Sequence, residues 1–186
     1  VTSAVKLAEA SGLQLTGAER VEHKGGSIHL LFRAVESEAI PDESIVKLLQ
    51  REGWLGSGTL TTYADLSARI EAASREVHQL LDTLPDSVVA GVGASISTTH
   101  LLHQFGIGSR VTRLFDDDAN KIGRFSPGFG IEVSPLKDLG RAESQSSILL
   151  AWQHSGVLLD RMRSVGFTGN VIVPLPHPHV VYLGPV

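Results

Sequence analysis

Glycines followed by a helical pattern form the part of this sequence best suited to holding an anion. Residues 87–90 are a short valine-rich run, Gly91-Val92-Gly93 follows it, and residues 95–105 have the apolar spacing of a helix. Glycine allows a tight turn with no side chain above it, and the first N–H groups of a helix that starts there attract phosphate. A tight turn that binds no ligand is the alternative. The dinucleotide fingerprint is incomplete, because Ile96 stands where it requires Gly or Ala.

A second group of chemically active residues lies in the loop 116–128, after a predicted strand at residues 111–115. The loop contains Lys121, Arg124 and Phe125. Basic residues beside an aromatic, beyond the carboxyl end of a strand, suit the phosphate and the base of a nucleotide. A solvated loop with one anchoring aromatic is the alternative. Asp116 follows Gly91 by about 25 residues, close to the spacing at which an acidic residue binds ribose hydroxyls in NAD-binding proteins.

Composition argues against several other kinds of chemistry. No HExxH, GxSxG or Walker A pattern occurs. The chain has no cysteine and eight histidines, and a metal site needs three or four converging ligands, so we expect no metal.

A net charge of −4 gives no reason to expect nucleic acid or an anionic membrane as a partner. No apolar run approaches the ~20 residues of a membrane span, no signal peptide is visible, and we expect a cytoplasmic protein. The residue types and their spacing alone do not identify a reaction.

The elements that position these residues follow one another as alternating strands and helices. From residue 87 onward the predicted order is strand, helix, strand, a further strand after the loop, then strand, helix and strand, with an edge strand at residues 180–183. Such an order implies right-handed crossovers and a mostly parallel sheet. We therefore predict an α/β fold with a Rossmann-like, mostly parallel sheet and flanking helices.

Before this sheet, the sequence predicts a helix plus a β-hairpin and a helical linker. The helix covers residues 2–11, the hairpin strands cover residues 13–22 and 27–35, and Asp42 is a plausible N-cap for a helix at residues 43–50. The longest helical pattern, residues 60–84, is expected to pack on the sheet. The predicted domains are 1–37, 38–85 and 86–186.

The sequence resembles the C-terminal region of S-adenosylmethionine-dependent sugar C-methyltransferases, which add a carbon branch to nucleotide-linked deoxysugars. Three blocks carry the resemblance. His23-Lys24-Gly25-Gly26-Ser27-Ile28 is similar to the family's H-G-G-S-hydrophobic-R strand, with Lys24 as an addition or substitution and His29 where Arg is usual. Gly91-Val92-Gly93-Ala94 is similar to its G-x-G-A turn. Residues 116–128 are similar to D-x-N-P-x-K-x-G-R-Y-x-P-G, with Phe125 in place of Tyr, and residues 148–152 resemble a later apolar strand that ends in Trp152.

The resemblance implies a layout and a role. Residues 1–37 would be the end of a truncated methyltransferase domain, residues 38–85 a helical connector, and residues 86–186 a C-terminal domain that helps to hold a nucleotide-linked sugar. The S-adenosylmethionine site, a zinc module and the family's catalytic residues would precede Val1, so this chain would be inactive alone. The family often has a lysine after G-x-G-A. Here Ser97-Thr98-Thr99-His100 follows, which weakens a phosphate contact.

Three functions are therefore compatible with the sequence. The first is nucleotide-sugar binding within a C-methyltransferase, with Arg124 on phosphate and an aromatic on the base. The second is an NAD(P)- or flavin-binding domain of an oxidoreductase, with Asp116 on the ribose. The third is a non-catalytic interaction module that docks through the helix at residues 60–84, and a homo-oligomer is compatible with this sequence. The predicted substrate-binding residues are Gly91, Gly93, Ala94, Asp116, Lys121, Arg124, Phe125, Trp152, His23 and Gly26.

Overall fold

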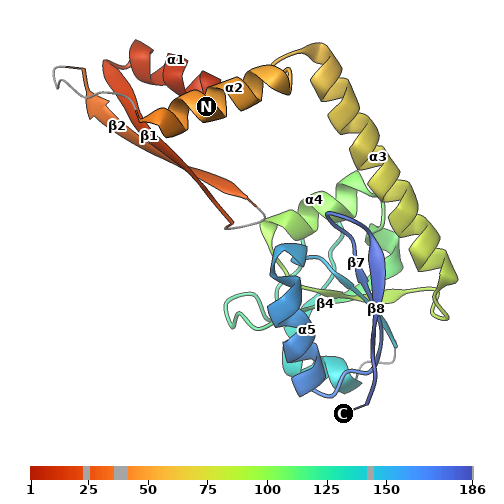
Figure 1. Cartoon of the computed structure of the whole chain (residues 1–186). Helices are drawn as coiled ribbons and strands as arrows, with labels where there is room; N and C mark the ends of the chain where they lie inside the picture. The colour runs from red at the N-terminus through yellow and green to blue at the C-terminus, as the bar shows by residue number, and fades with distance from the viewer. Residues whose placement is uncertain (23–25, 36–41, 142–144, 186) are drawn as a thin grey trace. The chain divides into compact units, whose positions relative to one another are not determined.

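A computed structural model describes residues 1–22, 26–35, 42–141 and 145–185. Two compact units, Val1–Ala68 and Arg69–Val186, each have their own internal contacts (Figure 1). The boundary between the units lies within one long helix. The domain boundaries expected after residues 37 and 85 stay a prediction.

The first unit is a β-hairpin with helices packed on one face. Its elements are α1 (Thr2–Ala10), β1 (Leu13–Val21), β2 (Ser27–Ala34) and α2 (Glu43–Trp54). The two strands are antiparallel, and a bulge shifts their register between Leu15 and Gly17. A small core of Leu15, Ala18 and Ile45 holds the helices to the hairpin. Asp42 caps α2 as predicted, since its carboxylate accepts the Ser44 N–H at 2.7 Å.

The second unit is built on a six-stranded sheet in the order β5-β4-β3-β6-β7-β8. The neighbouring strands are parallel except for β8, which runs antiparallel to β7. The predicted fold class is confirmed. The strands are β3 (Val89–Val92), β4 (Val111–Asp116), β5 (Val133–Pro135), β6 (Ser146–Leu149), β7 (Gly169–Val173) and β8 (His179–Leu183).

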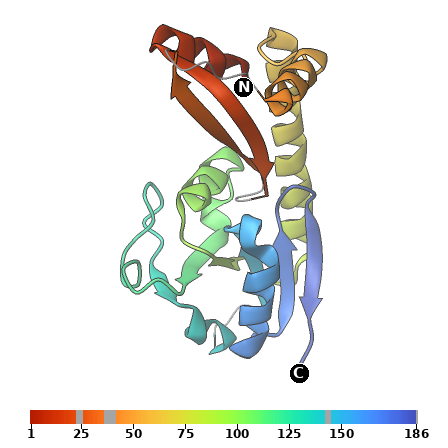
Figure 2. The same cartoon turned by 60° about the vertical axis from the view of Figure 1, so that its left-hand side comes forward.

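Helices cover both faces of this sheet. The long helix α3 (Leu60–Thr83) buries Val77 and Leu81 against one face, together with α4 (Ile96–Gln104). The opposite face packs against α5 (Ser155–Ser164) and the 3-10 helix η3 (Leu136–Arg141) (Figure 2). The prediction that the helix at residues 60–84 packs on the sheet is therefore confirmed for its part from Ile70 onward. Within the described ranges, no helix is both long enough and apolar enough to cross a bilayer.

The turn after β3 begins later than the sequence predicts. Gly91 lies inside the strand, with Leu114 on one side and Ile148 on the other as its partners in the sheet. A Cβ at Gly91 would lie 2.7 Å from both the Leu114 and the Leu150 side chains, so this glycine serves packing within the sheet. The chain instead turns at Gly93, where φ is 96°.

Candidate functional site

In chain order, β4 and β5 are added on one side of β3, and β6, β7 and β8 are added on its other side. The position between β3 and β6 is therefore a topological switch point. Ligands of open α/β sheets bind beyond the carboxyl ends of the strands at such a point. Gly93 follows β3 directly, and Ala151 lies two residues after the end of β6. A Cβ at Gly93 would lie 2.4 Å from the Ala151 Cβ. Close approach of the two strand ends therefore accounts for this glycine without any ligand.

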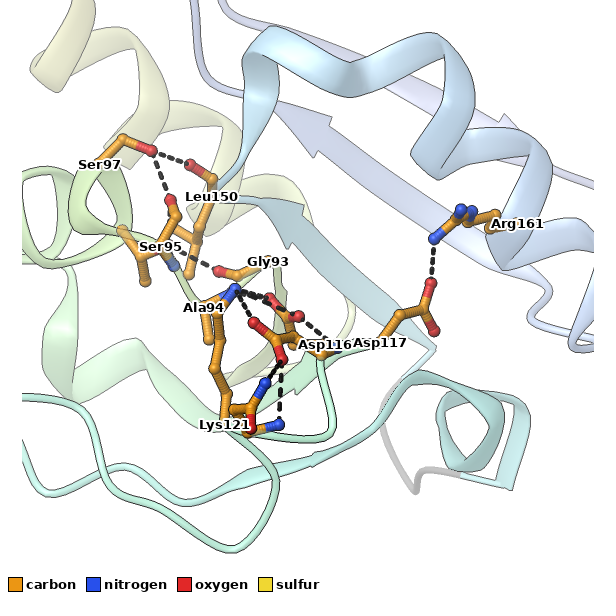
Figure 3. Close-up of polar contacts among 12 residues, drawn as sticks. Gly93, Ala94, Ser95, Ser97, Asp116, Asp117, Lys121, Leu150 and Arg161 are labelled. Carbon is orange, nitrogen blue, oxygen red and sulfur yellow. Dashed lines mark hydrogen bonds and ion pairs between the residues drawn. The ribbon is translucent and has the colours of Figure 1, made fainter.

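The start of α4 has its own hydrogen-bond acceptors. The Ala94 N–H donates to Asp116 Oδ2 at 2.7 Å, and the Ser95 N–H donates to Thr98 Oγ1 at 3.0 Å. Thr98 Oγ1 in turn donates to the Gly93 carbonyl at 2.6 Å, and Ser95 and Thr98 form a capping box. Because a carboxylate already accepts the Ala94 N–H (Figure 3), an anion directly above the glycine turn would meet negative charge.

Asp116 ties β4 to the start of α4 and to the loop that follows it. Besides Ala94, it accepts the Asp118 N–H at 2.8 Å through Oδ1. Lys121 Nζ lies 3.3 Å from Asp116 Oδ2, and the Asp116 side chain is only 14% exposed. Both carboxylate oxygens thus have partners within the fold, which disfavours the reading that Asp116 binds ribose hydroxyls.

The loop after β4 is held in shape by its own hydrogen bonds. Asn120 donates to Asp118 through its backbone N–H and its side-chain amide, both at 3.0 Å. These bonds, with a smaller effect from Lys121, lower the pKa of the Asp118 carboxyl. Further along, the Val133 N–H donates to the Arg124 carbonyl at 2.8 Å. The backbone at Arg124 is consequently fixed to the sheet.

Phe129, directly after this loop, anchors it, although Phe129 was not among the residues predicted from the sequence. Its ring packs on His103 with centroids 4.5 Å apart. It also lies over Gly108, where a Cβ would approach the ring to 2.1 Å. Phe125, by contrast, is 65% exposed. The alternative interpretation of this loop assumed one anchoring aromatic. In the structure, Phe129 takes that position.

One pocket, the Phe125 pocket, brings four predicted residues together: Ala94, Lys121, Arg124 and Phe125. Its volume is about 330 Å³. The other lining residues are mostly apolar or carry hydroxyls: Ser95, Ile96, Thr98, Thr99, Leu114, Ser126, Pro127 and Val133. Arg124 is exposed, and none of the ion pairs in the described part of the chain involves it.

A neighbouring hollow, the switch-point pocket, lies at the ends of β3 and β6 and has a volume of about 380 Å³. It shares Ser95 and Lys121 with the Phe125 pocket. Its charged and polar lining residues include Asp116, Asp117, Lys121, His154 and Arg161. His154 and Arg161 were not predicted from the sequence, because they come from η4 (Trp152–His154) and α5, whose position depends on the sheet topology.

Of the remaining predicted residues, four belong to the second unit and do not line the Phe125 pocket: Gly91, Gly93, Asp116 and Trp152. Gly93 and Asp116 line the switch-point pocket, whereas Gly91 is buried in the sheet. Trp152 lines a third, apolar hollow of about 470 Å³ on the other side of Ile96. Gly26 is an exposed residue of the hairpin in the first unit, and His23 lies outside the described residues. Across the described ranges, His, Asp and Glu side chains nowhere gather in the threes that a metal ion needs.

Comparison with protein families gives a match over most of the chain. The family described as C-methyltransferase C-terminal domain matches residues 22–176. The comparison with curated proteins finds no match. The matched range contains the hairpin strand β2, the long helix α3 and both pockets described above.

Proposed function

This chain belongs to the C-methyltransferase C-terminal domain family, and from that premise we propose that it holds a nucleotide-linked sugar for C-methylation. The resemblance seen in the sequence, to the C-terminal region of sugar C-methyltransferases, is confirmed at the level of the family. The nucleotide sugar as ligand is our proposal. It also makes S-adenosylmethionine the methyl donor, bound outside this chain, so that the chain alone transfers no methyl group.

The observation that carries the proposal is the make-up of the Phe125 pocket. An exposed aromatic ring and an exposed guanidinium are adjacent in sequence, on a backbone fixed by the bond between Val133 and Arg124. Ile96, which is 81% exposed, lies on the same pocket from the start of α4. An aromatic ring and an aliphatic side chain provide flat apolar contact for a base, and arginine is suited to binding phosphate through two parallel N–H bonds.

Charge supports a phosphate at the Arg124 side of this pocket. Lys121 is partly neutralised, since its Nζ lies 3.3 Å from Asp116 and 3.6 Å from Asp118. Arg124 has no such partner among the described ion pairs. The hydroxyls of Ser95 and Thr99 line the same pocket and can donate to phosphate oxygens without adding charge. We therefore assign the phosphate contact to Arg124, supported by these hydroxyls.

Calorimetric titration of the chain with thymidine diphosphate, thymidine diphosphate glucose and uridine diphosphate glucose tests this function. We expect saturable binding of at least one nucleotide sugar, together with a rise in melting temperature, since a ligand at 100 times its Kd adds about 2.7 kcal/mol of stability. Arg124→Gln should weaken binding about tenfold or more, as hydrogen bonds to charged groups contribute about 1.5–3 kcal/mol.

Lys137→Gln is the matched control for Arg124→Gln. Lys137 is also an exposed cation of the second unit, and it lines neither pocket, so this variant should bind like the unchanged chain. Absence of saturable binding at millimolar ligand would overturn the proposal. Saturation by NADH in a fluorescence titration would favour the oxidoreductase reading instead.

A further inference from the structure

The Phe125 pocket and the switch-point pocket adjoin one another, and they differ in chemistry. Ser95 and Lys121 line both. Each hollow is small for a ligand site, at the lower end of the ~300–1,000 Å³ range typical of such pockets. A nucleotide sugar is an elongated molecule with a flat base at one end and a hydroxylated ring at the other. Two joined hollows of unlike chemistry therefore fit it better than either hollow alone.

The switch-point pocket is lined by two carboxylates and two cations. Asp116 and Asp117 supply carboxylates, and Lys121 and Arg161 supply cations, with His154 beside them. Two carboxylates disfavour a diphosphate in this hollow. Sugar hydroxyls, which are neutral, can donate to carboxylates and accept from a guanidinium or an imidazole N–H. The lining thus suits a neutral ring with several hydroxyls.

Arg161 and Asp117 are available for such contacts. Their side chains form an ion pair between α5 and the residue after β4 (Figure 3). The Arg161 side chain is 54% exposed and that of Asp117 is 48% exposed. Ion pairs exposed to this degree are weak, so a sugar hydroxyl can replace part of the pairing at little cost. His154 is exposed at the same hollow, on the turn that follows β6.

We propose that the sugar of the nucleotide-linked substrate lies in the switch-point pocket, held by His154, Arg161 and Asp117. The base and the adjacent phosphate remain in the Phe125 pocket, and the second phosphate crosses at Lys121, which lines both hollows. This inference rests on the proposed function and adds the orientation of the ligand. His154 and Arg161 become determinants of sugar specificity, whereas Arg124 and Phe125 recognise the nucleotide whatever sugar it carries.

The test compares thymidine diphosphate with thymidine diphosphate glucose on the same variants by calorimetry. Arg161→Gln and His154→Ala should each lower the affinity for thymidine diphosphate glucose about tenfold, while the affinity for thymidine diphosphate stays nearly unchanged. Phe125→Ala should lower both affinities by the same factor. Arg163→Gln is the matched control, because Arg163 lies on the same helix, pairs with Asp160 and does not line the pocket.

The outcomes separate this inference from the function on which it rests. If Arg161→Gln and His154→Ala lower both affinities equally, the hollow holds phosphate and the inference is overturned. If neither variant changes either affinity, the sugar lies elsewhere and the inference is again overturned. In both cases binding by the unchanged chain leaves the proposed function standing. Only failure of the unchanged chain to bind thymidine diphosphate, thymidine diphosphate glucose and uridine diphosphate glucose removes that function.

Discussion

The backbone N–H of Ala94 donates a 2.7 Å hydrogen bond to the carboxylate of Asp116, so that the end of β4 is tied to the turn just before α4. The same carboxylate accepts the Asp118 N–H and faces Lys121. One side chain therefore joins the strand, the helix and the loop that shape both pockets.

Replacing Asp116 should destabilise the second unit. Asp116→Ala removes the acceptor of two backbone N–H groups, and leaving such groups unsatisfied costs about 1–3 kcal/mol each. Urea unfolding followed by circular dichroism measures the loss. Asp117→Ala is the control, since an exposed ion pair contributes about 0–1 kcal/mol. Equal stability of the two variants would contradict the role of Asp116 as acceptor for the Ala94 and Asp118 N–H groups.

Adding a single methyl group at Gly93 should be strongly destabilising. In Gly93→Ala the new Cβ would lie 2.4 Å from Ala151 in a backbone with φ of 96°. Overpacking costs about 1–3 kcal/mol, and the left-handed conformation adds about 1–2 kcal/mol for an L side chain. Gly123→Ala separates the two effects, because Gly123 has φ of 75° and open space around it. Thermal unfolding should show a clearly smaller loss for Gly123→Ala.

Replacing Phe129 and replacing Phe125 should have different effects on stability and on nucleotide binding. Phe129→Ala removes the ring that packs on His103 and Gly108. We expect a loss of stability of about 0.5–3 kcal/mol, together with weaker nucleotide binding. Phe125→Ala should leave stability within ~0.5 kcal/mol and weaken binding alone. Melting temperatures and calorimetric titrations on both variants measure this. A Phe125→Ala variant with normal affinity would show that Phe125 does not contact the base.

Acid should weaken the first unit through Asp42. Hydrogen bonds from the backbone and side chain of Ser44 lower the pKa of the Asp42 carboxyl. The folded pKa is therefore below the unfolded value of about 3.9, and the contribution of Asp42 to stability is present above that value and is lost as the pH falls through the folded pKa. Asp42→Asn keeps a good N-cap but does not titrate. The advantage of the unchanged chain over this variant in urea melts should shrink between pH 7 and pH 3. A constant difference would show that the cap does not depend on charge.

Much of the fold could be predicted because its signals are local. Short buried runs of valine and leucine, separated by glycine and by helical spacing, predicted the order of strands and helices around the sheet. The position of the first turn was wrong because a packing glycine and a turn glycine look alike in sequence. Gly91 is distinguished only by Leu114 and Leu150, which reach it from β4 and from the segment after β6.

The site was less predictable, because distant segments supply its walls. Lys121, Arg124 and Phe125 were found together, since one loop carries them. His154 and Arg161 reach the switch-point pocket only through the path of the chain after β6. Trp152 lines a different hollow from Arg124, since the direction of a side chain after a strand depends on how the next turn folds.

The packing of the Phe129 ring has a consequence for how this sequence can evolve. Its ring fits only where position 108 has no Cβ, and the His103 imidazole fits only where position 128 has none, since a Cβ there would come within 2.5 Å of Nε2. Positions 103, 108, 128 and 129 should therefore covary across relatives. Lineages that lose the aromatic ring would be released from glycine at position 108, and would present a differently shaped loop to whatever molecule they bind.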